Sequence, residues 1–196
     1  GVASTGVLAT ESKYHTFLSK RFDRRDDGKR IHFASAMTLL GLMDGANAGT
    51  GNGYLDIVDF MIQGCTNVEV NLQELYRRVA FNICVGNTDD HFRNHGFLLT
   101  PKGWTLSPAY DMNPTLNEQQ SLLISSSSCE SDLTILLDAC EDYMLSKDMA
   151  VKIISEVVDT MKGWRQLAMR LQISKREIDL FAHRFDRYSS FVFSAV

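Results

Sequence analysis

The chain has 196 residues, of which 44% are hydrophobic and 22% charged, a balance that excludes a disordered chain and fits one domain around a single core. Its formal net charge of −4 provides no basic surface, so we expect no direct binding of nucleic acid. Because the sequence has no apolar run long enough to span a bilayer and no signal peptide, we expect a cytoplasmic protein without membrane contact.

Four cysteines are spread widely along the chain, and no Cys-x-x-Cys pair is present. Cys65, Cys84 and Cys140 lie in apolar helical patterns, and Cys129 follows a run of serines. This spacing favours free, buried thiols in a reducing compartment over a disulfide framework.

The N-terminal part of the chain begins with residues 1–12, which are small and polar and typical of a loosely ordered segment. Residues 14–22 contain aromatic and aliphatic side chains that favour a strand or a connection between two lobes. An edge strand without any ligand is the plain alternative for this run. Residues 31–42 carry apolar side chains at helical spacing, so we expect a helix there.

A loop with four glycines follows at residues 44–53. A phosphate-binding loop requires a strand before its glycines and, in the Walker form, a Gly-Lys-Ser/Thr at its end. The sequence has neither, so we expect a solvent-exposed loop.

Two helices are predicted next. Residues 55–62 have a short helical pattern, and Asn71 with Glu74 resembles a capping box that opens a longer helix ending near Val85. The apolar face of this longer helix consists of Leu72, Leu75, Val79 and Ile83.

A β-hairpin is predicted from two short β-type runs, residues 96–100 and 104–106, joined by a Pro-Lys-Gly turn. Asp89 and Asn94 precede it and Asp111 follows it. A protein-kinase active site has the same spacing, and the turn would bring Asp111 back toward Asn94.

That spacing assigns a role to each residue. Asp89 would accept the proton of the substrate hydroxyl, while Asn94 and Asp111 would supply oxygen ligands to Mg²⁺. Asp90 is the rival base, although it lies only four residues before Asn94.

After Asp111 the chain contains a run of serines, residues 125–128, which we interpret as a solvated loop rather than a phosphorylation tract. From Asp132 onward the pattern is helical. Ser174 and Glu177 form a capping box for the last helix. The apolar stripes that we expect in the core are Leu133, Leu136, Leu137 and Cys140, then Ile154, Val157, Val158 and Met161, then Ile178, Phe181, Phe185 and Tyr188.

The motif residues resemble a known family. Residues 87–94 read NTDDHFRN, residues 107–111 read SPAYD, and residues 20–24 read KRFDR. This combination is similar to the HipA family of bacterial serine/threonine kinases, and the similarity covers nearly the whole chain. The resemblance implies an α+β, mainly helical fold: a protein-kinase-like C-terminal lobe with a small catalytic hairpin.

The resemblance also implies a function, the toxin kinase of a toxin–antitoxin pair. Mg²⁺ and ATP would be its cofactor and substrate, with Lys20, Phe22 and His91 beside the nucleotide. A DNA-binding antitoxin would be its partner, and an aminoacyl-tRNA synthetase would be its protein substrate by analogy with the family.

Two other classes of function stay open. His91 and His95 have the i, i+4 spacing of a zinc site, but Phe92 stands where a metalloprotease has Glu, so we expect His91 to orient the catalytic loop and His95 to be polar surface. A non-catalytic interaction module is the more serious alternative. The stretch before Lys20 is too short for the Gly-rich loop and Lys of an N-terminal lobe, so we expect that lobe outside this sequence or on a separate polypeptide, and we expect the isolated chain to be inactive.

Overall fold

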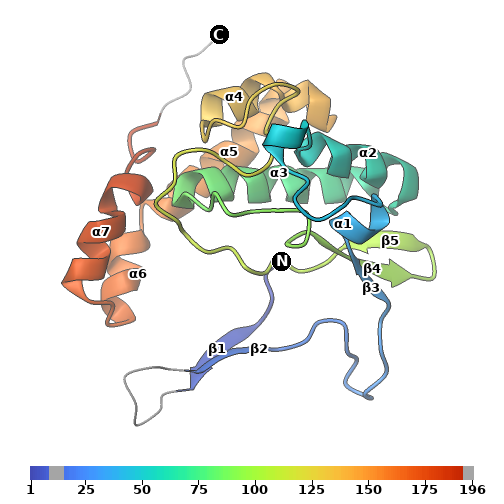
Figure 1. Cartoon of the computed structure of the whole chain (residues 1–196). Coiled ribbons are helices and arrows are strands. Elements are labelled where there is room, and N and C mark those ends of the chain that lie inside the picture. The colour runs from blue at the N-terminus through green and yellow to red at the C-terminus, as the bar shows by residue number, and fades with distance from the viewer. Residues whose placement is uncertain (9–15, 192–196) are drawn as a thin grey trace.

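The computed structural model describes residues 1–8 and 16–191 (Figure 1). Within them, no helix is both long and apolar enough to cross a membrane. The elements in chain order are β1 (Thr5–Leu8), β2 (Thr16–Ser19), β3 (Phe33–Ser35), α1 (Ala36–Leu39), η1 (Ala48–Thr50), α2 (Tyr54–Gly64), α3 (Val68–Val85), β4 (Gly96–Thr100), β5 (Gly103–Leu106), α4 (Leu133–Asp138), η2 (Cys140–Tyr143), α5 (Lys147–Met161), α6 (Trp164–Arg170) and α7 (Lys175–Phe185).

Helix α3 lies at the centre of the molecule and packs against α2, α4 and α5 (Figure 1). Its predicted apolar face is confirmed, because Leu72, Leu75, Val79 and Ile83 are all at most 2% exposed. Burying each such side chain contributes roughly 1.5–3 kcal/mol. The predicted stripes of α4 and α5 meet this face, so the central helix is a rigid support for the loop that follows it.

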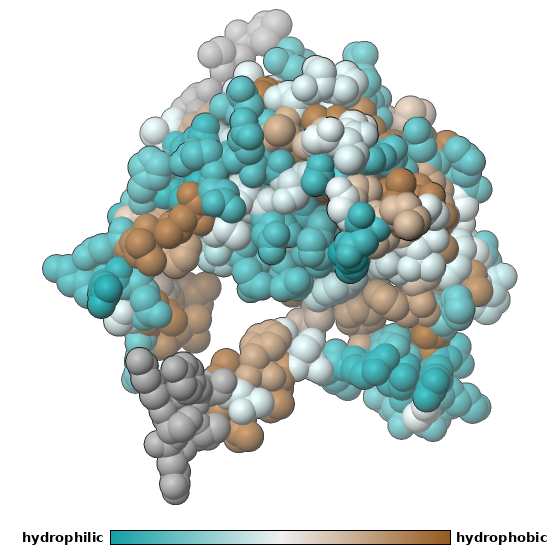
Figure 2. Space-filling model, in the orientation of Figure 1, coloured by the Kyte–Doolittle hydropathy of each residue, from teal (hydrophilic) through white to brown (hydrophobic). Residues whose placement is uncertain are grey.

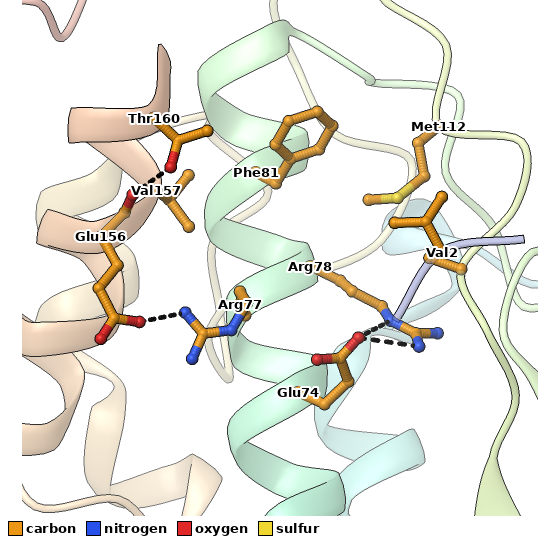
Figure 3. Close-up of a pocket in the computed structure, with 10 residues that line it drawn as sticks. Val2, Glu74, Arg77, Arg78, Phe81, Met112, Glu156, Val157 and Thr160 are labelled. Carbon is orange, nitrogen blue, oxygen red and sulfur yellow. Dashed lines mark hydrogen bonds and ion pairs between the residues drawn. The ribbon is translucent and has the colours of Figure 1, made fainter. Parts of the chain in front are cut away.

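The contact between α3 and α5 shows which force holds the helices together. Arg77 on α3 donates to Glu156 on α5 over 2.7 Å, and Phe81 and Val157 lie beside this ion pair (Figure 3). Both charged side chains are more than one-third exposed, so the pair contributes less than about 1 kcal/mol. The apolar contacts therefore dominate.

The predicted hairpin is confirmed as β4–β5, and β3 adds a third antiparallel strand beside β4. We expected a helix throughout residues 31–42, but Phe33–Ser35 form β3 and only Ala36–Leu39 are helical. Phe33 pairs across the sheet with Leu98, and Ser35 caps α1 by accepting a hydrogen bond from the Thr38 N–H. Long-range strand pairing thus overrides the local helical pattern.

A second, separate ribbon consists of β1 and β2, which pair antiparallel. We expected residues 1–12 to be loosely ordered, but Thr5–Leu8 form a strand, while residues 9–15 lie outside the described part of the chain. Val7 and Phe17 pair with each other and are 67% and 68% exposed. The ribbon projects away from the helices and carries a hydrophobic surface (Figures 1 and 2).

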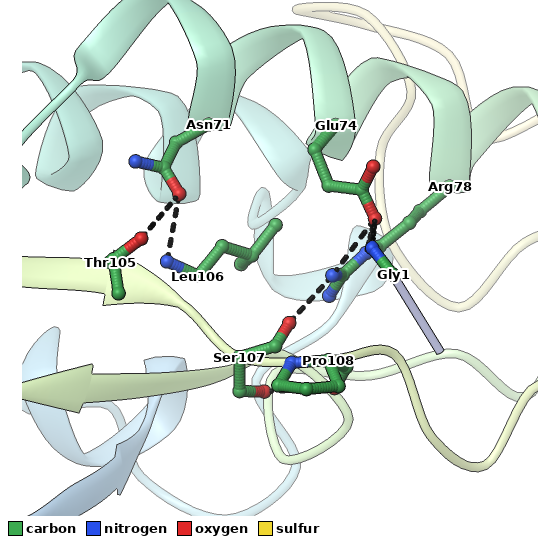
Figure 4. Close-up of polar contacts among 8 residues, drawn as sticks. All are labelled: Gly1, Asn71, Glu74, Arg78, Thr105, Leu106, Ser107 and Pro108. Carbon is green, nitrogen blue, oxygen red and sulfur yellow. Dashed lines mark hydrogen bonds and ion pairs between the residues drawn. The ribbon is translucent and has the colours of Figure 1, made fainter. Parts of the chain in front are cut away.

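Asn71 does not cap α3 as we expected, because the helix begins at Val68, one turn earlier. Asn71 is instead buried and joins three segments (Figure 4). Its Nδ2 donates to the Thr66 carbonyl over 2.6 Å, and its Oδ1 accepts from the Leu106 N–H over 2.8 Å and from the Thr105 hydroxyl over 3.1 Å. The side chain therefore fixes the hairpin against the central helix.

The C-terminal helices differ in how deeply they are buried. The capping box of α7 is confirmed, since Ser174 accepts from the Glu177 N–H and Glu177 accepts from the Ser174 N–H. Only Tyr188 of its predicted core stripe is buried, at 7% exposure, whereas Ile178, Phe181 and Phe185 are half-buried. All four cysteines are free as predicted, with Cys84 and Cys140 buried and Cys65 and Cys129 half-buried.

We predict that Asn71→Ser destabilises the protein by roughly 2–3 kcal/mol, because Ser cannot satisfy the buried groups that Asn71 joins. Gln73→Ser on the same helix should cost under about 1 kcal/mol, since only helix propensity and a surface contact to Glu69 change. Urea denaturation of both variants measures the difference. Equal, small losses of stability in the two variants would contradict the proposed hydrogen bonds from Asn71 to the hairpin. They would fit instead a helix N-cap at Asn71, where Ser and Asn are equivalent.

Candidate functional site

The site begins where α3 ends. Gly86 adopts a left-handed conformation with φ of +69°, and its N–H closes the helix by donating to the Ile83 carbonyl. A Cβ at this position would lie 2.9 Å from the Arg184 side chain, so the position requires glycine. Asn87 then folds back, with its backbone N–H and its side-chain amide donating to Asn82 over 2.8 and 3.1 Å. Residues 87–95 thus leave a rigid helix end as a tightly held loop.

Asp90 is buried at the base of this loop, with 3% of its surface exposed. One carboxylate oxygen, Oδ2, accepts hydrogen bonds from the Tyr54 hydroxyl over 2.7 Å and the Asn82 amide over 2.8 Å, and lies 2.7 Å from Nε2 of His95. Burial alone would raise the pKa of Asp90, but the charge and hydrogen bond of His95 and the hydrogen bond from Tyr54 outweigh it and lower that pKa. Asp90 is therefore a structural carboxylate and is poorly placed to act as a base.

Asp89, the adjacent residue, has the opposite environment. Its side chain is exposed, and among the described residues no hydrogen bond or ion pair holds its carboxylate. Because the Asp90 side chain is fixed inside, the backbone directs Asp89 outward. One carboxylate of the pair is thus free to meet a ligand, as a general base must be.

The far side of the loop is anchored to α1 and the core. Phe92 is completely buried, and its carbonyl accepts from the Met37 N–H over 3.3 Å. The His95 carbonyl accepts from the Ala36 N–H over 2.7 Å. Both ends of the loop are therefore fixed by backbone hydrogen bonds.

The two predicted metal ligands are linked through their neighbours. The Tyr110 hydroxyl donates to the Arg93 carbonyl over 2.6 Å, which ties the residue before Asp111 to the residue before Asn94. Asn94 is 9% exposed. Asp111 is exposed and left-handed with φ of +55°, an uncommon conformation for a residue other than glycine.

The donor chemistry of these two residues suits Mg²⁺. Asn94 offers an amide oxygen, and Asp111 offers a carboxylate whose Oδ1 also accepts from the Asn113 amide over 2.6 Å. Magnesium prefers few hard oxygen ligands from protein and takes the rest from phosphate and water. The residues present therefore fit the expected ion.

Three positioning residues were not found from the sequence. Arg78, on α3, donates to the Ser107 carbonyl over 2.6 Å and to Glu74 over 3.1 Å, and so holds the start of the 107–111 segment (Figure 4). Thr115 donates to the Gly86 carbonyl, and the Ser121 N–H and hydroxyl donate to the Thr88 carbonyl. No local pattern indicated the contacts to Ser107, Gly86 and Thr88, because each of these three joins residues more than 25 positions apart.

Cavities lie next to three of the predicted site residues. A cavity of about 620 Å³ lies between the β1–β2 ribbon and residues 109–113, and Asp111 is part of its lining. A smaller one, of about 260 Å³, is lined by Lys20, Phe22 and Tyr110 among others. The Phe22 ring lies 5.7 Å from that of Tyr110. The Lys20 N–H is already bound to the Ser4 carbonyl, and its side chain is 74% exposed.

His95, rather than His91, is the histidine that forms a hydrogen bond within this loop. His95 is buried and bonded to Asp90, whereas we expected polar surface, and His91 is half-buried with its Nδ1 unpaired among the described residues. Because His95 Nε2 is already bound to Asp90 and the stretch is not helical, the two rings do not form the i, i+4 zinc pair. His91 stays a predicted nucleotide neighbour.

We predict that Asp90→Asn destabilises the fold by roughly 3 kcal/mol at pH 7. A carboxylate whose pKa is lowered by folding stabilises the protein above its unfolded pKa, near 4, and loses this effect as the pH falls through the folded pKa. The difference in unfolding free energy between wild type and Asp90→Asn should therefore become smaller below about pH 4. Urea denaturation at several pH values measures it, with the exposed Asp89→Asn as control. Equal losses in both variants at pH 7 would refute the buried network.

Comparisons with known proteins identify the family of the chain. The HipA-like C-terminal domain family matches residues 1–165. A serine/threonine-protein kinase toxin HipA from Shewanella oneidensis is 31% identical over 117 residues, covering 51% of this chain and 27% of that protein. A putative kinase from Haemophilus influenzae is 29% identical over 105 residues, covering 50% of this chain and 31% of that protein. The chain thus spans about a third or less of these relatives.

A solved structure shows the same fold. The toxin–antitoxin complex of Shewanella oneidensis HipA and HipB with operator DNA contains a chain that matches with a TM-score of 0.78 at 18% identity. The match covers 96% of this chain and 50% of that one, and it confirms the expected α+β fold of a HipA C-terminal domain. With most of its length matched by the family and its fold shared with a HipA structure, this chain belongs to the HipA-like C-terminal domain family.

Proposed function

We propose that this chain is the catalytic lobe of a HipA-like serine/threonine kinase that transfers the γ-phosphoryl group of ATP to a hydroxyl group of a protein. The pair of adjacent carboxylates carries the proposal: Asp90 is fixed inside a hydrogen-bond network, and Asp89 is exposed on the loop that the network holds. A kinase needs one free carboxylate at a fixed position.

Each residue then has a defined task. Asp89 accepts the proton of the attacking hydroxyl, and Asn94 and Asp111 hold Mg²⁺, which when bound neutralises charge on the phosphates. The cavity that Asp111 lines, together with the smaller one at Lys20 and Phe22, provides room for the nucleotide. Tyr110 keeps the two metal ligands in register through its bond to Arg93.

We propose that the N-terminal lobe, whose Gly-rich loop and Lys would bind the phosphates, comes from polypeptide outside this sequence. The β1–β2 ribbon supports this, because all eight of its residues are exposed and a two-stranded ribbon is at best marginally stable alone. Its apolar side chains, including Val7 and Phe17, are suited to packing against further strands. On its own the chain should therefore lack appreciable kinase activity.

The biological setting follows from the relatives. One is named a kinase toxin, and the matched structure contains HipB and operator DNA. We extend the proposal to a cytoplasmic toxin whose partner is a DNA-binding antitoxin and, by family resemblance alone, whose substrate is an aminoacyl-tRNA synthetase. The alternative is a non-catalytic lobe that only binds partners.

We predict that Asp89→Asn in the complete kinase lowers phosphoryl transfer by at least about a hundredfold, because a general base is lost. Its melting temperature should be unchanged, since the exposed carboxylate has no partner among the described residues. Asp59→Asn, an exposed aspartate on α2, is the matched control and should keep full activity. A radiolabelled phosphate-transfer assay decides. Retained turnover in Asp89→Asn would remove this residue from the role of base.

We predict that Asn94→Ala and Asp111→Ala each weaken Mg²⁺-dependent nucleotide binding by about tenfold or more, because each removes one of two protein ligands. Calorimetric titration of the complete kinase with ADP, with and without Mg²⁺, measures this. Asn117→Ala, at an exposed asparagine in the following segment, should have no effect. The assignment of Asn94 and Asp111 as Mg²⁺ ligands would be contradicted if nucleotide binding depended on Mg²⁺ equally in wild type and both variants. It would also be contradicted if zinc fully replaced Mg²⁺ in nucleotide binding.

A further inference from the structure

An apolar groove shares Met112 with the cavity that Asp111 lines. It has a volume of about 570 Å³ and runs between α6 and α7, with the end of α5 and the segment after Asp111 as its other wall. The apolar side chains that line it are Phe81, Val85, Met112, Pro114, Met161, Trp164, Leu167, Ala168, Leu171, Ile173, Ile178, Phe181 and Phe185.

This groove is open surface rather than closed core. Leu167, Leu171 and Ile173 line it and are 45%, 62% and 44% exposed. Figure 2 shows hydrophobic surface beside the hydrophilic outer face of the α6–α7 pair. Exposed apolar side chains that gather in a groove are suited to contact with a partner, and a groove between two helices is suited to a third.

The charge around the groove identifies the kind of partner. Residues 162–187 contain seven Lys and Arg against three Asp and Glu, so they carry a formal charge of +4 in a chain of net charge −4. Arg165 is paired with Asp186, and Arg184 with Glu118. Three further cations cluster at the turn between α6 and α7, where Leu171 and Ile173 line the groove.

These three are Arg170, which ends α6, and Lys175 and Arg176, which begin α7. All three are exposed, and within residues 1–8 and 16–191 none of them has an ion-pair partner. Among the nearby acids, Glu177 is engaged in the capping box with Ser174. Glu177 also lines the groove and Asp179 follows it on α7, but within the described residues neither is ion-paired with these three cations, so this end of the rim keeps an excess of positive charge.

We propose that the α6–α7 groove binds an amphipathic helix of a protein partner whose polar face is acidic. Apolar side chains at i, i+3, i+4 and i+7 of that helix would fill the groove, and its Asp and Glu residues would face Arg170, Lys175 and Arg176. The apolar floor disfavours nucleic acid, whose phosphates need polar contacts along the whole binding surface.

Binding in this groove would reach the candidate active site. Met112 and Pro114 form part of the groove wall, and Met112 also lines the cavity that contains Asp111. An occupant would thus touch the segment that carries a proposed metal ligand, which makes the groove a place for regulation or substrate docking. This consequence rests on the proposed function, whereas the docking itself does not.

A designed helical peptide tests the proposal. The probe is a 16-residue amphipathic peptide with Leu and Phe on one face and Glu on the other, labelled for fluorescence anisotropy, and its counterpart has Lys in place of Glu. We expect the Glu peptide to bind, with an affinity that falls as salt is raised, and the Lys peptide to bind at least about tenfold more weakly.

Matched variants locate the binding site. Leu167→Glu should weaken binding of the Glu peptide by about tenfold or more, and Lys175→Glu with Arg176→Glu should weaken it several-fold. Met169→Glu, on the same helix and 61% exposed but outside the groove lining, should bind like wild type. Circular dichroism checks that each variant folds. If Leu167→Glu does not fold, the Lys175→Glu, Arg176→Glu variant still decides the test.

Several results would overturn the proposal. One is equal binding of the Glu and Lys peptides, and another is an unchanged affinity in both Leu167→Glu and the charge variant. Tighter binding of a DNA duplex, lost in the charge variant, would assign the rim to nucleic acid. Sedimentation showing a dimer that Leu167→Glu dissociates would assign the groove to a second copy of the chain. None of these measurements uses kinase activity. A negative result would therefore reject the docking proposal without rejecting the proposed function.

Discussion

Three hydrogen-bonding groups from different parts of the chain converge on one buried oxygen of Asp90. Tyr54 comes from α2, Asn82 from α3, and His95 from the end of the loop itself. A buried carboxylate without such partners costs several kcal/mol, so the loop has one low-energy arrangement. The rest of the site depends on this constraint, since it determines which of two adjacent carboxylates faces the solvent.

The exposed carboxylate, Asp89, obtains its position from its neighbour rather than from contacts of its own. The proposed metal ligands are likewise positioned by their neighbours, because Tyr110 and the left-handed backbone at Asp111 place Asn94 and Asp111. The groups proposed to carry chemistry keep free surface, while the groups beside them make the hydrogen bonds. This division is the arrangement that preorganised catalysis requires.

Local signals in the sequence were sufficient for the hairpin, the end of α3 at Val85, the α7 capping box and the apolar stripes of α3, α4 and α5. Long-range pairing was not accessible in this way. β3 depends on pairing with β4, about 60 residues later, and Asn71 resembles a cap until its partners on β5 are known. The buried role of His95 was missed for a related reason, because the spacing of five residues between His95 and Asp90 in an irregular loop does not show that both side chains turn inward.

The motif spacing identified Asp89, Asn94 and Asp111 as one group, and the fold places all three on segments that its hydrogen bonds join. Their chemical roles depend on ligands and so stay predictions. Helix α7 shows where such patterns fail. Its stripe predicted core, but helical periodicity does not distinguish burial in the chain's own core from burial against a partner.

The central claim is that the buried Asp90 network holds the loop that presents Asp89. Hydrogen-exchange mass spectrometry of residues 87–95 tests it most directly, in wild type, Asp90→Asn and Asp89→Asn, with the α5 amides as an internal reference for global unfolding. The account predicts that loop amides exchange about tenfold or more faster in Asp90→Asn, beyond any change in α5, and at the wild-type rate in Asp89→Asn. Unchanged loop exchange in Asp90→Asn, or equal acceleration in both variants, would contradict it.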